Sequence, residues 1–260
     1  MSKKVQDIIE KVRSGVCKFE FLDGAGNIMN SGSGFVYNKQ LITNNHVFHP
    51  DGHVFSENTQ IRIIFGNDDI YNLQLSDLRL IIGSEEASAD YAVFKTTAFD
   101  FENRYSFELS DTTDIRDGDE ILLIGFPFET KYLTTHHGRI SAFFQENGVN
   151  KIQVDASVNQ GNSGGPLIHL DSGKVVGIVT RKQTGLTRDF DEMITAMEQN
   201  IEILGKTGGM IASFGGVDLI QAFRSIQAQM LRVSVNIKRS ANTGIGYAFS
   251  CEKLIADLGR

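Results

Sequence analysis

The sequence predicts a mostly β protein made of two β units side by side, interrupted by a helical insertion. Two observations carry this prediction. Short apolar segments bounded by Gly, Asn and Asp recur in two successive runs along the chain. They follow one another about every 8–12 residues, which is the spacing of strands in β-barrels and β-sandwiches. The chain also has 26 glycines and only 3 prolines among 260 residues, which suits many tight turns and argues against proline-rich linkers.

The chain is expected to begin with a short amphipathic helix over residues 1–14. Val5, Ile8, Ile9 and Val12 recur at helical spacing and form one apolar face, which can dock on the body of the protein.

The first β unit is expected over 15–110 and the second over 111–184 and 231–249. Their apolar segments include Val16–Leu22, Leu41–Thr43, Ile61–Phe65, Glu120–Gly125, Lys151–Val154 and Lys174–Thr180. The two units share no obvious sequence similarity.

The helical insertion is expected over 185–230. Apolar residues fall on one helical face in each of two segments: Phe190, Ile194, Met197 and Ile201, then Ile220, Phe223, Ile226 and Met230. Beyond the insertion, apolar and polar residues alternate over 231–237, which predicts a strand. We expect a second strand over 243–249. Ser250 can cap a last helix over 250–260.

Charge and composition exclude several classes of function. The net charge of −7, from 25 basic and 32 acidic residues, argues against a nucleic-acid partner. No apolar stretch approaches the ~20 residues that span a bilayer. The two lysines near the start are not followed by the apolar run of a secretory signal. We therefore expect a cytoplasmic protein with no membrane partner, in which Cys17 and Cys251 are reduced.

The strongest chemical signal is the motif Gly161-Asn-Ser-Gly-Gly-Pro166. A nucleophilic serine needs an exposed tight turn, and glycine permits both the turn and a close approach of the backbone. Amide N–H groups can then point at a developing oxyanion. The motif predicts Ser163 as a nucleophile, with the N–H groups of Gly161 and Ser163 as an oxyanion hole.

Two further residues fit the same chemistry. His46 follows the apolar segment that ends at Thr43, a place where a general base is held rigidly. Asp90 opens another apolar segment, and a buried carboxylate there needs a partner such as an imidazole N–H. The chain order His46, Asp90, Ser163 is that of the chymotrypsin-type double barrel and differs from the orders of subtilisin and the α/β-hydrolases.

The motifs identify a family resemblance. They are Gly32-Ser-Gly-Phe35, Thr43-Asn-Asn-His-Val47, Asp90-Tyr-Ala-Val93, Gly125-Phe-Pro127, Asn159-Gln-Gly-Asn-Ser-Gly-Gly-Pro-Leu167, Gly177-Ile-Val-Thr180 and Gly244-Ile-Gly-Tyr-Ala-Phe249. With them the chain resembles the chymotrypsin-like serine proteases, specifically the HtrA/Deg-like branch, over about residues 15–182 and 231–258. The resemblance implies two six-stranded antiparallel β-barrels and hydrolysis of peptide bonds through an acyl-enzyme.

The resemblance also implies a substrate site. Ser157 would line the base of the primary specificity pocket, and Thr180 would lie on the strand that pairs with the substrate backbone. Because Ser157 is neutral, we expect cleavage after small or medium apolar residues. The chain departs from the family in its helical insertion and in ending at Arg260, where HtrA proteins continue into a PDZ domain.

These observations predict a serine endopeptidase that needs no cofactor and no metal ion, since His46, His49 and His53 are too loosely spaced for a zinc site. The alternative is a catalytically silent binding or scaffold protein of the same fold. The insertion is expected either to recruit a regulatory protein partner, to cover the cleft, or to complete the core.

Overall fold

The computed structural model describes residues 3–50, 54–85, 87–128, 130–182, 188–206, 213–214, 217–240 and 244–259. The chain forms two compact units. One consists of Met1–Gln183 together with Gly244–Arg260, and the other of Thr184–Thr243. Each unit is described by itself.

The first unit begins with an amphipathic helix, as the periodicity of the sequence predicts. Helix α1 (Lys3–Val12) continues into the 3-10 turn η1 (Arg13–Gly15). Val5 and Val12 are buried, and Ile8 and Ile9 pack against the same core cluster. The apolar face of the helix therefore anchors the start of the chain to the body of this unit.

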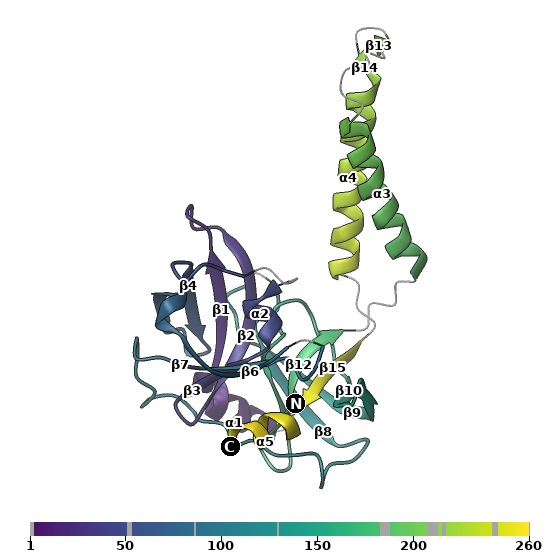
Figure 1. Cartoon of the computed structure of the whole chain (residues 1–260). Coiled ribbons are helices and arrows are strands. Elements are labelled where there is room, and N and C mark those ends of the chain that lie inside the picture. Colours follow the sequence, from purple (N-terminus) through teal and green to yellow (C-terminus); the bar gives the residue numbers. More distant parts are fainter. Residues whose placement is uncertain are drawn as a thin grey trace. The chain divides into compact units, whose positions relative to one another are not determined.

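The first β half is an antiparallel sheet of seven strands (Figure 1). The strands are β1 (Val16–Leu22), β2 (Ile28–Tyr37), β3 (Gln40–Thr43), β4 (Gln60–Phe65), β5 (Ile70–Gln74), β6 (Arg79–Ser84) and β7 (Tyr91–Lys95). Helix α2 (Asn45–Phe48) follows β3, and η3 (Leu75–Asp77) separates β5 from β6.

This half differs from the predicted six-stranded barrel. The strand order is β5-β4-β1-β2-β3-β7-β6, so seven strands pair instead of six. Among the described residues the end strands β5 and β6 pair only with β4 and β7, respectively, and not with each other. The hydrogen bonds therefore define an open sheet.

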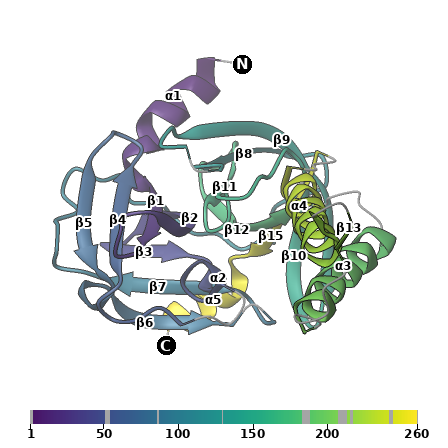
Figure 2. The same ribbon diagram turned by 90° about the horizontal axis from the view of Figure 1, so that it is seen from above.

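The second β half is a closed barrel of six strands in the order β10-β15-β12-β11-β8-β9, which confirms the prediction for this half. Its strands are β8 (Glu120–Gly125), β9 (Thr134–Glu146), β10 (Val149–Asp155), β11 (Pro166–His169), β12 (Val175–Lys182) and β15 (Ile245–Ser250). Helix α5 (Glu252–Leu258) ends the described chain. Figure 2 shows the sheet and the barrel side by side.

Apolar packing joins the two halves. The sheet has an aromatic-rich core that includes Phe19, Phe21 and Phe48, and the barrel has an aliphatic one. A third buried cluster takes residues from both, such as Phe35 and Tyr91 from the sheet and Ile124 and Ile178 from the barrel. The boundary between the halves is therefore a packed interface that can hold side chains rigidly.

The two cysteines are free thiols, both fully buried. Burial raises the pKa of the Cys17 thiol and of the Cys251 thiol. Since the thiolate is the reactive form, neither side chain is suited to redox or nucleophilic chemistry.

The second unit is a helical hairpin of α3 (Arg188–Lys206) and α4 (Leu219–Ser240), with two short strands, β13 (Ser213–Phe214) and β14 (Val217–Asp218). Lys238 near the end of α4 pairs with Asp191 near the start of α3 at 2.7 Å, so the helices run antiparallel. No helix among the described residues is long and apolar enough to cross a membrane.

The prediction of a strand over 231–237 was wrong, and so was the end of the insertion at residue 230. Helix α4 continues to Ser240, and the unit extends over Thr184–Thr243. The alternating apolar residues there also fit a helical period. Within this part of α4, Ser234 is buried at 7% exposure.

Candidate active site

His46 is positioned by the turn from β3 into α2. Thr43, the last residue of β3, pairs with Ala92 of β7. This pairing places the start of α2 near Asp90, which precedes β7. The side-chain amide of Asn44 donates to the carbonyl oxygen of Asp90 at 2.6 Å. The backbone N–H of His46 then donates to Oδ1 of Asp90 at 3.0 Å, and Nδ1 of its ring lies 2.7 Å from Oδ2.

Asp90 is a fully buried carboxylate in a strained backbone conformation. Its φ of 45° lies in the left-handed region, which costs a non-glycine residue energy and is tolerated where surrounding contacts hold it. Both oxygens are occupied, since Oδ1 accepts from the His46 backbone and Oδ2 faces the His46 ring and Thr180. The ring nitrogen that faces a carboxylate carries the proton, which leaves Nε2 of His46 as the basic atom.

Thr180 connects this pair to the barrel. Its Oγ1 donates to Oδ2 of Asp90 at 3.2 Å, and its side chain is buried. The pairing of β12 with β15 shifts register between Val179 and Arg181, so Thr180 is the extra residue of a bulge. In a bulge the extra residue does not join the regular hydrogen bonds between the strands. The hydroxyl and the carbonyl of Thr180 can therefore bind other groups of the site.

Ser163 lies in a turn that glycine makes possible. Gly161 and Gly164 have φ values of 95° and 88°. A Cβ on Gly164 would lie 2.1 Å from the carbonyl oxygen of Ser33, and one on Gly161 would lie 2.4 Å from that of Phe126. No other residue fits this path of the backbone.

The hydroxyl of Ser163 donates to the carbonyl oxygen of Thr180 at 2.6 Å. Its proton is therefore directed at Thr180 in this structure. Because one carbonyl and one hydroxyl of Thr180 bind Ser163 and Asp90, respectively, the structure brings His46, Asp90 and Ser163 together around a single residue.

The sheet also supports the serine turn. Ser33 of β2 donates its backbone N–H to the Ser163 carbonyl at 2.7 Å and its hydroxyl to the Gly161 carbonyl at 2.6 Å. Sequence analysis did not assign Ser33 or Asn44 a role, although both lie inside motifs that the resemblance rests on. The available signal was their place in those motifs, Ser33 between two glycines and Asn44 two residues before His46.

The proposed oxyanion donors are free in the described part of the chain. Neither the Gly161 N–H nor the Ser163 N–H donates to a protein acceptor there. Ser157, by contrast, is exposed in the loop after β10 and makes no hydrogen bond to another described residue. Its expected place at the base of the specificity pocket stays a prediction.

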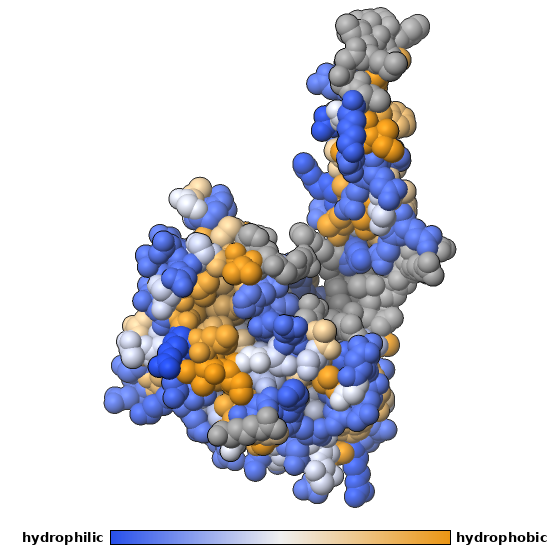
Figure 3. Space-filling view, in the orientation of Figure 1, coloured by the Kyte–Doolittle hydropathy of each residue, from blue (hydrophilic) through white to orange (hydrophobic). Residues whose placement is uncertain are grey.

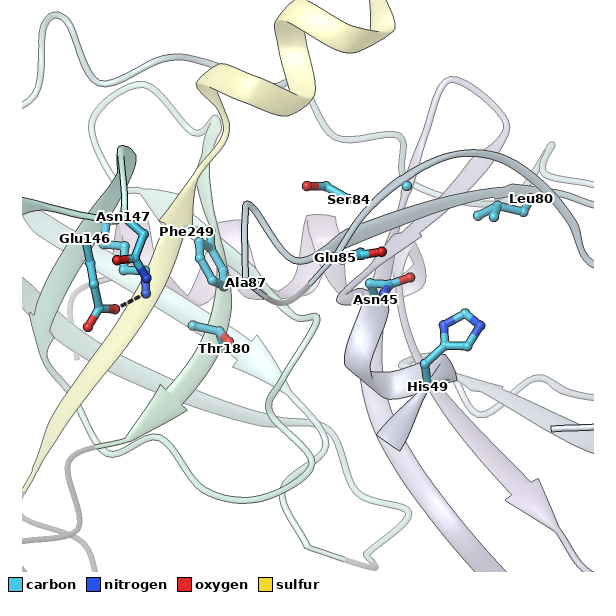
Figure 4. A pocket seen from close by; sticks show the side chains of 12 residues that line it. Asn45, His49, Leu80, Ser84, Glu85, Ala87, Glu146, Asn147, Thr180 and Phe249 are labelled. Atoms are coloured by element: carbon cyan, nitrogen blue, oxygen red, sulfur yellow. Dashed lines mark hydrogen bonds and ion pairs between the residues drawn. The ribbon is translucent and has the colours of Figure 1, made fainter. Parts of the chain in front are cut away.

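A groove of about 880 Å³ adjoins Thr180 and opens between the sheet and the barrel (Figure 4). Asn45, Leu80 and Glu85 line it from the sheet, and Glu146, Lys151 and Phe249 from the barrel. Lys151 forms an ion pair with Glu146, whereas the Glu85 side chain is exposed. A groove of this size can hold an extended peptide segment.

No cluster of three potential metal ligands occurs among the residues that the structure describes. His49 lines the groove, and His53 lies outside the described residues. The described donors therefore give no reason to place a metal ion in this site.

The residue types gathered where the two β units meet, a serine, a histidine and an aspartate, are those that chymotrypsin-type hydrolases use. A family model described as "Trypsin-like peptidase domain" matches residues 32–178, more than half of the chain, so the chain belongs to that family. The matched span contains His46, Asp90 and Ser163.

The chain is similar to several proteases. A DegP-like periplasmic serine endoprotease of Hahella chejuensis is 36% identical over 165 residues, which cover 60% of this chain and 30% of the relative. One of Rickettsia conorii is 31% identical over 193 residues, 69% and 34% of the two chains. The chain thus spans about a third of the length of these curated relatives.

The fold is also that of a solved HtrA-type protease, an AlgW variant with a tripeptide. The two share 21% identity at a TM-score of 0.60, over 98% of this chain and 62% of the other. The expected likeness to the HtrA branch is confirmed. The expected cytoplasmic location was wrong, because the curated relatives in Hahella and Rickettsia are periplasmic proteases.

Proposed function

We propose that the protein is a serine endopeptidase with Ser163 as nucleophile, His46 as general base and Asp90 as the residue that orients His46. One observation carries the proposal. Asp90 is fully buried and faces the Nδ1 edge of His46 at 2.7 Å, which is how a carboxylate selects the imidazole tautomer that accepts a proton at Nε2.

The reaction begins when the Ser163 hydroxyl turns from the Thr180 carbonyl to Nε2 of His46. His46 takes the proton as the oxygen attacks the substrate carbonyl carbon, and the Gly161 and Ser163 N–H groups stabilise the resulting oxyanion. His46 then protonates the leaving amine, and water hydrolyses the acyl-enzyme by the reverse sequence. The N–H groups of Gly161 and Ser163, which donate to no described acceptor, support the oxyanion role.

We further propose that the enzyme cuts after small or medium apolar residues, with Ser157 at the pocket base and Thr180 beside the substrate backbone. The neutral side chain of Ser157 supports this preference, since an acidic residue at that place selects basic substrates. The groove beside Thr180 supports binding of the residues that precede the cleaved bond.

A fluorophosphonate probe tests the activity. The parent protein should be labelled at Ser163, and Ser163→Ala should not be labelled. Ser172→Ala, an exposed serine in the turn after β11, is the matched control and should label like the parent. Absence of labelling in the folded parent would favour the catalytically silent scaffold instead.

For the helical unit we propose a role in protein association. It forms a compact unit of its own, which supports a docking role over completion of the β core. Replacing residues 184–243 by a short Gly-Ser bridge tests this. A soluble product that still cleaves small peptides, but has lost activity on a protein substrate, supports docking. Faster peptide cleavage would indicate a lid, and an insoluble product would indicate a core element.

A further inference from the structure

Helix α4 carries an apolar stripe that its pairing with α3 leaves exposed. We define the α4 outer stripe as Leu219, Phe223, Ile226, Met230 and Val233, whose exposed fractions are 49%, 54%, 52%, 49% and 57%. Their spacing alternates between four and three residues, the heptad spacing of a helix that packs along its length on another helix. Single exposed apolar residues are ordinary, but five in one register form a continuous face.

This stripe is separate from the face that α4 turns to α3. The inner face contains Gln227, Leu231 and Ser234, which are half-buried or buried, and Lys238, which pairs with Asp191. At about 100° per residue, the outer stripe lies about a quarter-turn round the helix from that face. A helix with two packing faces a quarter-turn apart is typical of a four-helix bundle, where each helix touches two neighbours.

Helix α3 extends the apolar surface. Met197 is buried at 8% exposure on the face toward α4, while Met193 is 38% exposed and Ala196 is exposed. Met193 and Ala196 lie about a quarter-turn from the α3 inner face. Because the helices are antiparallel, these residues and the α4 outer stripe lie on one side of the hairpin. Figure 3 shows apolar side chains over the hairpin.

Charge favours a second copy of this chain as the occupant. The residues that flank the outer stripe are uncharged: Ala222, Gln227, Gln229 and Ser234. Two copies of the face can therefore meet without opposing like charges. Beyond these, the sequence of α4 has four basic residues, Arg224, Arg232, Lys238 and Arg239, and no acidic one. The sequence of α3 has five acidic residues, Asp189, Asp191, Glu192, Glu198 and Glu202, and two basic ones, Arg188 and Lys206. Opposite charges meet when α4 of one copy lies against α3 of the other.

We propose that the hairpins of two chains pack together as an antiparallel four-helix bundle, in which each α4 outer stripe faces α3 of the second copy. The stripe with Met193 and the flanking residues exposes on the order of 500 Å² per hairpin. Two hairpins thus bury about 1,000 Å², the area at which specific interfaces begin. The hairpin is a self-association module of the chain.

Sedimentation equilibrium of the full chain at about 100 μM tests this, because a Kd in the micromolar range leaves most of the chain associated at that concentration. The parent should sediment at twice its 28.8 kDa mass. Ile226→Glu combined with Met230→Glu should sediment as a monomer, while Ala228→Glu, an exposed position off the stripe, should remain dimeric. A monomeric parent, or a stripe variant that stays dimeric, would overturn the proposal.

A second measurement leaves the stripe intact. A spin label on Ser225→Cys, exposed and off the stripe, should report one distance between labels by pulsed electron resonance. The native thiols are buried and should stay unlabelled. The distance should disappear on dilution with unlabelled chain. Absence of any label-to-label distance would overturn the proposal, and so would a distance that persists in the Glu-substituted stripe variant.

Discussion

Thr180 of the closed barrel donates a hydrogen bond to Asp90, the residue before strand β7 of the seven-stranded sheet, with 3.2 Å between Oγ1 and Oδ2. The bond crosses the boundary between the two β halves. Asp90 is thus held from both sides, by the Asn44 amide and the His46 backbone within the sheet and by Thr180 from the barrel. The position of this carboxylate therefore depends on contacts from both halves.

Removing that crossing bond should lower activity. Thr180→Val keeps the shape and removes the hydroxyl, so Asp90 loses one donor. Because a hydrogen bond to a charged group contributes about 1.5–3 kcal/mol, kcat should fall about 10- to 100-fold. Steady-state kinetics on a peptide ester measure this. Thr180→Ser, which keeps the donor, is the matched control. Equal rates for the Val variant and the parent would show that Asp90 does not depend on Thr180.

Asp90 should be needed for the rate more than for substrate binding. Asp90→Asn favours the wrong imidazole tautomer, so kcat should fall by up to about 10⁴-fold with KM little changed. The exposed carboxylate Asp100 provides the control, since Asp100→Asn should keep the parent rate. A similar fall in both variants would remove Asp90 from the mechanism.

Gly161 should tolerate no side chain. Gly161→Ala places a Cβ 2.4 Å from the Phe126 carbonyl oxygen in a backbone with a φ of 95°. Gly148→Ala is the matched control, because its φ is 77° but nothing lies within 4 Å of the added atom. The control should lose about 1–2 kcal/mol of unfolding free energy from the left-handed conformation alone. Urea unfolding should show a clearly larger loss for Gly161→Ala, together with loss of probe labelling. Equal losses would mean that the turn has room to relax.

Much of the site was predictable because its signals are local. The glycines round Ser163 and the polar residues that end apolar segments are visible within a few positions. The residues that support the serine turn were harder to predict from the sequence. Ser33 acts through contacts with a turn more than a hundred positions away, and no local pattern encodes that. The site roles of Ser157 and Thr180 stay predictions.

The fold was less predictable where two periods coincide. Residues 231–237 alternate as a strand does, yet Val233 also continues the heptad of α4, and packing on α3 decides for the helix. Strand β5 escaped notice because Ile70 and most of its neighbours are exposed or half-buried, so it has no apolar alternation to detect. The edge strand is the reason that seven strands pair where six were expected.

Acid should weaken the tie between α5 and the barrel. Burial alone would raise the pKa of Glu252, but hydrogen bonds from Thr112, Asn150 and Ser250 outweigh it and hold the pKa below its ordinary value. A depressed carboxyl pKa stabilises the fold above the unfolded-state value, and this contribution is lost as pH falls through the folded-state pKa.

Glu252→Gln should therefore be less stable than the parent near neutral pH, and the difference should shrink as the pH falls below about 4.3. Urea unfolding across that range measures it. Glu102→Gln, at an exposed position, should match the parent throughout. A difference that does not change with pH would assign the effect to shape instead of charge.

The neighbouring strands β12 and β15 have a consequence for the order in which the protein can fold during synthesis. Lys182 pairs with Gly246, so the strands that close the barrel flank the whole helical unit in sequence. The seven-stranded sheet is complete once Lys95 has left the ribosome, whereas the barrel must wait for β15. Closure over a flexible segment costs entropy that rises by about 0.6 kcal/mol for each doubling of its length. Helices α3 and α4 can form early and shorten that span, so the hairpin should speed the closing of the barrel it interrupts.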